Sequence, residues 1–275
     1  MTHVSSERIR PAAVAGMFYS RDPRELAQTL DAMLAVASQS TSSTAIPKAI
    51  IAPHAGYVYS GPIAASVYAL LKPARASIRR IVLLGPTHRV AVRGLALPDT
   101  DAFATPLGVV PIDREAIAVL GKLPQVTTSP AAHAFEHSLE VHLPFLQSVI
   151  GPFTLVPLAV GYADAGQVAE VLDALWGGRE TLIVVSSDLS HYHPYAQAQA
   201  IDRHTADAIL KLETGITHEE ACGATPVIGL NLAAQRRRLR PQLLDLRNSG
   251  DTAGDRGRVV GYGAFAYFEN NGNEH

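Results

Sequence analysis

The chain has 275 residues, 47% of them hydrophobic, and a formal net charge of −2 with histidine neutral. No strongly basic charge is present, so we do not expect nucleic acid as a partner. No run reaches the ~18 apolar residues of a membrane-spanning helix, and the single cysteine, Cys222, excludes an intrachain disulfide framework. We therefore expect a soluble, cytoplasmic protein with no membrane partner.

Apolar runs and helical segments alternate along the chain. Asp22 is placed to cap a helix that begins at Pro23, and a Ser/Thr-rich loop follows at 38–44. The further elements that we expect are a strand at 48–52, a helix at 61–71, a strand at 80–84, short strands between 93 and 112, a helix from Asp113 to about Leu120, a helical segment at 139–150, a strand at 153–160, a helix at 165–176, a strand at 182–185, helices at 196–212 and 226–238, and strands at 241–246 and 259–268. This alternation predicts a single α/β domain whose central sheet is mostly parallel or mixed, with helices on both faces.

Histidines and a carboxylate follow three of the apolar runs. His54 comes after the first run and His88 after the second, and Asp188 with His191 comes after a third. Ligands of open α/β sheets bind outside the carboxyl ends of the strands. These side chains can therefore converge on a metal or acid/base centre, although each histidine taken alone can equally be bonded to loop backbone.

Asp188 and His191 are three residues apart and can face the same way. A carboxylate can fix the tautomer of an imidazole, and His191 can act as a general base near neutral pH. The alternative is that Asp188 caps the following turn and His191 is exposed.

Cys222 stands just before the expected helix at 226–238. A cysteine near a helix N-terminus has a lowered pKa and can be a nucleophile or a soft metal ligand. A buried structural thiol is the other interpretation, and it is the commonest one for a lone cysteine.

His133 to His137 matches H-x-x-E-H, a zinc pattern of metalloproteases. The pattern requires a helix that places both histidines on one face, and Pro130 and Pro144 leave room for only a short one. We therefore expect His133 at the surface rather than in a zinc site. Glu136, His137 and Glu140 are better candidates for a site, because they continue into an apolar segment.

An ordered set of motifs resembles the Memo-like family, called AmmeMemoRadiSam system protein B in prokaryotes. The motifs are Pro53-His54-Ala55-Gly56-Tyr57, Gly85-Pro86-Thr87-His88, Glu136-His137-Ser138-Leu139-Glu140-Val141-His142-Leu143-Pro144, Ser186-Ser187-Asp188 with His191, and Cys222-Gly223. The resemblance extends from about Arg10 to Phe268. It implies a fold similar to that of class III extradiol dioxygenases.

The resemblance also implies a set of site residues. The metal ligands would be His54, His88 and Cys222, and the residues that line the same pocket as catalytic candidates would be Glu136, His137, Asp188 and His191. Extradiol enzymes bind iron through two histidines and a carboxylate, whereas here a thiolate would replace the carboxylate. Thiolate favours copper(I), zinc or a redox-active iron site, so dioxygenase activity does not follow from the fold.

Three classes of function remain open from the sequence. The first is an oxidoreductase that depends on iron or copper, with zinc as a further candidate metal and His191, oriented by Asp188, moving protons. The second is a non-catalytic metal- or peptide-binding partner in a complex with AMMECR1-like and radical SAM proteins. The third is a hydrolase, which uses either zinc on His133 and His137 or Cys222 as a nucleophile with His191 or His88 as its base. The substrate, whether small molecule or peptide, is not identified by any of these patterns.

Overall fold

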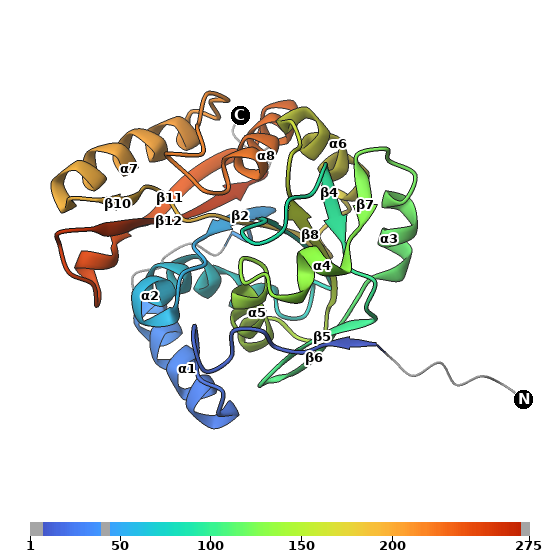
Figure 1. Ribbon diagram of the computed structural model, residues 1–275, viewed down its shortest axis with the longest axis horizontal. Coiled ribbons are helices and arrows are strands. Elements are labelled where there is room, and N and C mark those ends of the chain that lie inside the picture. Colours follow the sequence, from blue (N-terminus) through green and yellow to red (C-terminus); the bar gives the residue numbers. More distant parts are fainter. Residues whose placement is uncertain (1–7, 40–44, 271–275) are drawn as a thin grey trace, which may run out of the picture.

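A mixed β-sheet forms the centre of the computed structural model, and helices cover both of its faces (Figure 1). The structure describes residues 8–39 and 45–270, so most of the Ser/Thr-rich loop predicted at 38–44 lies outside the described residues. None of the helices within the described residues is both long and apolar enough to cross a membrane.

The large sheet has the strand order β10-β12-β2-β9-β3-β8-β4-β7, and β11 pairs with β12. Its strands are β2 (Ala49–Ala52), β3 (Arg80–Pro86), β4 (Leu95–Leu97), β7 (Val126–Thr128), β8 (Thr154–Val160), β9 (Thr181–Ser186), β10 (His191–His193), β11 (Arg240–Asn248) and β12 (Val259–Phe268). The neighbours β2, β9, β3 and β8 run parallel, whereas β12 and β4 lie antiparallel to this group. The sheet is therefore mixed, with a parallel centre.

The central strands are apolar over their middle positions because both of their faces are buried. In β3, Ile81 and Leu83 face one hydrophobic cluster, and Val82 and Leu84 face the other. Side chains of a strand alternate between the two faces of a sheet, so a strand between two layers of helices needs a continuous apolar run. This is the physical basis on which the sequence pattern predicted these strands.

The helices form one layer on each face of the sheet. The first layer contains α1 (Pro23–Gln39), α2 (Tyr57–Tyr68), α5 (Leu143–Val149) and the short helices η1 (Ala69–Ala74), α4 (Pro130–Ala134) and η2 (Glu140–His142). The second layer contains α3 (Arg114–Leu120), α6 (Ala165–Leu175), α7 (Tyr195–Leu210) and α8 (Ala224–Arg237). A 3₁₀ turn, η3 (Ser249–Asp251), joins β11 to β12, and a second sheet contains β1 (Ile9–Arg10), β5 (Ala102–Thr105) and β6 (Gly108–Pro111).

Most of the predicted elements are confirmed, and the caps have the expected chemistry. The Asp22 carboxylate accepts the amides of Arg24 and Glu25, and the Asp113 carboxylate accepts the amide of Ala116. The helix predicted to begin at Gly61 begins earlier, at Tyr57. A Cβ at Gly61 would lie 2.6 Å from the sulfur of Met33, so this glycine permits close packing of α2 on α1.

The segment predicted as one helix at 139–150 is divided into η2 and α5. Pro144 stands in the first turn of α5, where its missing amide hydrogen costs no helical bond. The short elements β1, β7, β10 and α4 were not predicted. Each has five residues or fewer, which is too short for a periodic pattern to develop.

A buried ion pair ties the N-terminal segment to the loop before α5. The carboxylate of Glu140, which is fully buried, accepts bonds from Arg10 Nη1 at 2.6 Å, from the Tyr19 hydroxyl at 2.6 Å and from the amides of Ala13 and Val14. Arg10 also donates to the carbonyls of His133 and Glu136. The Arg10 and Glu140 side chains depend on each other because both are buried.

We predict that Glu140→Gln destabilises the fold by about 3–5 kcal/mol, because it leaves the Arg10 guanidinium buried without its counter-charge. Urea unfolding followed by circular dichroism measures this free energy. Asp99→Asn is the matched control: it removes the carboxylate from an exposed ion pair with Arg8 and should cost less than about 1 kcal/mol. Equal losses in the two variants would contradict the structural role of Glu140.

Candidate metal centre

Three parallel strands deliver three polar residues to one edge of the sheet. His54 stands two residues beyond the end of β2, His88 two residues beyond β3, and Asp188 two residues beyond β9. Since β9 lies between β2 and β3 and all three run in the same direction, these residues meet on one side. The structure therefore brings His54, His88 and Asp188 to the same edge of the sheet, where the sequence indicated that they could converge.

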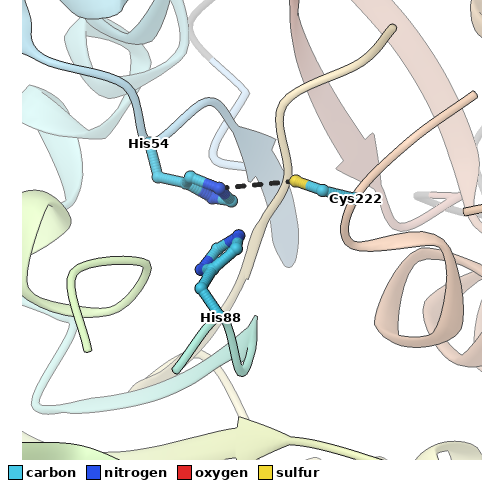
Figure 2. A group of neighbouring side chains, drawn as sticks. All are labelled: His54, His88 and Cys222. Carbon is cyan, nitrogen blue, oxygen red and sulfur yellow. Dashed lines mark hydrogen bonds between the residues drawn. The ribbon is translucent and has the colours of Figure 1, made fainter. Parts of the chain in front are cut away.

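Cys222 joins the two histidines from the loop that precedes α8. One donor atom each from His54, His88 and Cys222 lies within 4.8 Å of the other two. Figure 2 shows the three side chains pointing toward a common point, with Nε2 of His54 at 3.4 Å from the sulfur of Cys222. Two imidazoles and a thiol form a donor set that suits iron, copper or zinc.

The loop around Cys222 is held closely against the end of β9. The sulfur lies 3.3 Å from the amide nitrogen of Asp188, and the amide of Gly223 donates to the Ser187 hydroxyl. A Cβ at Gly223 would stand 2.6 Å from the carbonyl oxygen of Ser186, so only glycine permits this approach.

The expectation of a lowered pKa for Cys222 is wrong. Burial and the nearby Asp188 carboxyl raise the pKa of the thiol to about 12. Both effects disfavour the thiolate, and they outweigh the hydrogen bonds from Asp188, Ser187 and Gly223, which act in the opposite direction. The thiol is therefore protonated at neutral pH as long as nothing else binds it.

Burial has the opposite effect on the proton affinity of His54. This side chain is 1% exposed, and burial followed by the neighbouring His88 and His137 holds its pKa well below the usual value. His54 is accordingly a neutral imidazole at physiological pH, and its Nδ1 lies 2.6 Å from the hydroxyl oxygen of Ser186.

Glu136 lies directly behind His88. Its carboxylate accepts the backbone amide of His88 at 2.6 Å, His88 Nδ1 at 2.8 Å, and the amides of His137 and Ser138 at 2.9 Å each. Burial alone would raise the pKa of this carboxyl, but the bonds from His88 and Ser138 prevail and lower it to about 2. Glu136 is therefore an anion that hydrogen bonds from four N–H groups stabilise.

The ring of His137 stacks on the ring of His88. Its ring centroid is 4.5 Å from that of His88 and 5.4 Å from that of His54, and Phe18 packs against it at 4.8 Å. His88, Glu136 and His137 also have donor atoms within 4.8 Å of one another. A second ion there would compete with the four N–H bonds that already occupy the Glu136 carboxylate, so the first group is the better candidate site.

Asp188 borders the centre but does not bond to His191. One of its carboxylate oxygens accepts the amide of His54 at 2.7 Å, and the other lies 4.0 Å from His54 Nε2. Burial raises the pKa of Asp188, against the opposing effects of the His54 amide and of a charge on His191. His191 is partly exposed on β10, beside Tyr192, and no hydrogen bond within the described residues orients it from Asp188.

The H-x-x-E-H interpretation fails on the position of His133. This residue is 2% exposed, its Nε2 bonds to the carbonyl of Ala96 at 2.8 Å, and its ring packs near Phe103. His133 ends in the interior beside β4, while His137 faces His88 beyond the end of α4. The two histidines do not share a ligand point, and the expectation of a surface position is also wrong.

Two serines near the centre received no role from the sequence. Ser186 and Ser138 are fully buried, and Ser186 connects Nδ1 of His54 to the main-chain carbonyl of Ser138. Both residues occur in the motifs of the sequence, but serine is too common at strand ends for its presence to indicate a contact.

Comparison with known proteins agrees with the motif order. The family described as Memo-like protein matches residues 10–266. A MEMO1 family protein of Aquifex aeolicus is 36% identical over 93% of this chain and 97% of its own length, and the MEMO1 family protein MK0963 of Methanopyrus kandleri is 35% identical over 94% and 98%.

A solved structure provides a match at the level of fold. The uncharacterized protein JW3007 from Escherichia coli K12 has a TM-score of 0.51 and 14% sequence identity, over 79% of this chain and 98% of that protein. Identity this low supports a common α/β architecture and nothing about activity. The family match and the relatives, in contrast, extend over nearly the whole chain, and the chain therefore belongs to the Memo-like protein family.

Proposed function

We propose that this protein binds one redox-active metal ion, iron or copper, on His54, His88 and Cys222 and acts as a metal-dependent oxidoreductase. The observation that supports this most directly is the convergence of these three donors, from three separate segments, within 4.8 Å. The first test is the metal content of protein purified without a histidine tag. A stoichiometric redox metal supports the proposal, and zinc in the same site would favour a redox-inactive role.

The donor set determines which metals fit. Two neutral imidazoles and one thiolate carry a single negative charge, and the soft sulfur favours copper(I), zinc or redox-active iron over hard cations such as Mg²⁺. When bound, iron or copper would supply one-electron chemistry. A relation to class III extradiol dioxygenases belongs to this proposal, and it is consistent with the α/β architecture and with a site at the carboxyl ends of parallel strands.

The surrounding residues would handle protons and substrate. Asp188 has one carboxylate oxygen near Nε2 of His54, where it can hold a proton at the edge of the site. The partly exposed His191 can exchange protons with solvent. We propose His137, Asp188 and His191 as the groups that contact a substrate, and Glu136 as a residue that acts through His88.

The arrangement argues against both hydrolase mechanisms. A nucleophilic cysteine needs a thiolate, whereas burial and Asp188 keep Cys222 protonated. The imidazole closest to its sulfur is His54, and the low pKa of His54 makes it a poor base. A zinc protease site would need His133, which lies in the interior.

A second candidate function is that of a binding partner, with AMMECR1-like and radical SAM proteins as the proposed partners. Three exposed apolar side chains flank site residues along the chain: Met17 precedes Phe18, Phe135 precedes Glu136, and Tyr192 follows His191. Contiguous exposed apolar surface is typical of faces that bind other proteins, and we propose these three side chains as the contacts of such a face. A pull-down with the purified proteins, with and without metal, tests this candidate.

We predict that Cys222→Ser weakens copper(I) binding by orders of magnitude, because the variant keeps the shape of the side chain but loses the soft ligand. Competition titration against a copper(I) chelator measures the change. His204→Gln is the control, since His204 is largely exposed and outside the site, and it should bind copper(I) like the unmodified protein. Unchanged affinity in Cys222→Ser would remove Cys222 from the ligand set.

We also predict that zinc, used as a probe, displaces about one proton per ion between roughly pH 7 and pH 9. The thiol pKa of about 12 means that Cys222 must lose its proton on binding, whereas His54, with its lowered pKa, has none to lose. The affinity should therefore rise about tenfold per pH unit. Calorimetry in buffers of different ionisation enthalpy counts the protons, and affinity independent of pH would contradict a thiol ligand.

A further inference from the structure

We infer that the loop Glu136-His137-Ser138 sets the tautomers of both ligand histidines, so that His54 and His88 each present a free Nε2 to the same point. Ser186, Ser138 and Glu136 are positioning residues in this scheme, and none of them is a ligand. The inference rests on the proposed function, in which His54 and His88 bind the metal.

The tautomer of His54 follows from a chain of two hydrogen bonds. The main-chain carbonyl of Ser138 can only accept, so the Ser186 hydroxyl donates its one proton to it, at 2.6 Å. The Ser186 oxygen must then accept from Nδ1 of His54, also at 2.6 Å. The proton therefore stands on Nδ1, and Nε2, the nitrogen that lies 3.4 Å from the sulfur of Cys222, is the one left for a metal.

The tautomer of His88 follows from its contact with Glu136. An ionised carboxylate only accepts, so Nδ1 of His88 donates to Glu136, at 2.8 Å. Nε2 is then the only nitrogen of His88 left for a metal. A carboxylate behind a ligating histidine is a general means of fixing the ring and raising its basicity.

The loop itself is fastened to the strand that carries His88. The Ser138 hydroxyl donates to the carbonyl of Pro86, the last residue of β3, at 2.8 Å. A Cβ at Gly85 would stand 2.8 Å from this hydroxyl oxygen, so glycine at that position permits the approach. The same loop therefore bonds to His88 directly, through the carboxylate of Glu136, and to His54 through Ser186, which donates to the carbonyl of Ser138.

This loop lowers the free-energy cost of metal binding, because neither histidine has to be converted from its other tautomer. A neutral imidazole in water exchanges its proton between the two nitrogens, and only the form with a free Nε2 can bind here. Residues that hold the tautomer and the orientation of a ligand typically change metal affinity about 10- to 100-fold when they are mutated.

The inference is tested first on the metal-free protein. Nitrogen-15 NMR of labelled histidine distinguishes a ring protonated on Nδ1 from one protonated on Nε2. We expect Nδ1–H for both His54 and His88 at neutral pH. A proton on Nε2 of either ring would overturn the inference for that residue, and this measurement requires no variant that must fold.

Ser186→Ala then removes the acceptor behind His54 without touching any ligand. We expect His54 to lose its fixed Nδ1–H tautomer while His88 keeps its own, and zinc affinity to fall about 10- to 100-fold. Ser186→Thr restores a hydroxyl and should recover most of the affinity. Ser60→Ala is the matched control: its hydroxyl is equally buried and also donates to a carbonyl, that of Ala55, but it contacts no histidine and should change neither readout.

The outcomes separate this inference from the proposed function. Both histidines in the Nδ1–H form, in a protein that binds no iron, copper or zinc, would support the tautomer scheme and refute the proposed function. Tight metal binding with equal affinity in Ser186→Ala and in the unmodified protein would overturn the positioning role of Ser186 and leave the proposed function intact.

Discussion

The parallel pairing of β2, β9 and β3 is the constraint on which the site depends. In-register parallel strands end at the same edge, so residues at equal distances beyond their ends are brought side by side. His54, Asp188 and His88 are such residues. Apolar clusters pack against both faces of the sheet, so the geometry of the centre follows from the packing of the core.

Burial shifts the pKa values of His54 and Cys222 in opposite directions, and in both residues it favours the uncharged form. It lowers the pKa of His54, which favours the uncharged imidazole, and raises that of Cys222, which favours the uncharged thiol. Glu136, directly behind His88, is ionised and is surrounded by N–H donors. A cation that binds the sulfur of Cys222 would displace the proton of this thiol.

Much of the architecture could be predicted because its signals are strong in the sequence alone. The interior positions of β3 and β9, Ile81 to Leu84 and Leu182 to Val185, are all apolar, and the helices after Asp22 and Asp113 carry their own caps. Short elements such as β10 could not be predicted, since a three-residue strand is defined by its partner and not by its own pattern. The partners within the site were equally hidden: the resemblance suggested His54, His88 and Cys222 together, but the bond from Ser186 to the Ser138 carbonyl joins residues 48 positions apart.

The segment from His133 to Glu140 contributes both to the stability of the fold and to the geometry of the candidate metal site. At one end Arg10 holds the carbonyls of His133 and Glu136, and at the other it is neutralised by Glu140. Within this segment the carboxylate of Glu136 bonds to His88, and the carbonyl of Ser138 bonds to Ser186, which contacts His54. The Glu140 ion pair lies away from the ligands, yet it limits how far this segment can move. The buried Arg10–Glu140 pair therefore stabilises the backbone that positions the residues of the centre. This role is a physical reason for burying an arginine and a glutamate despite the free-energy cost of removing both charges from water.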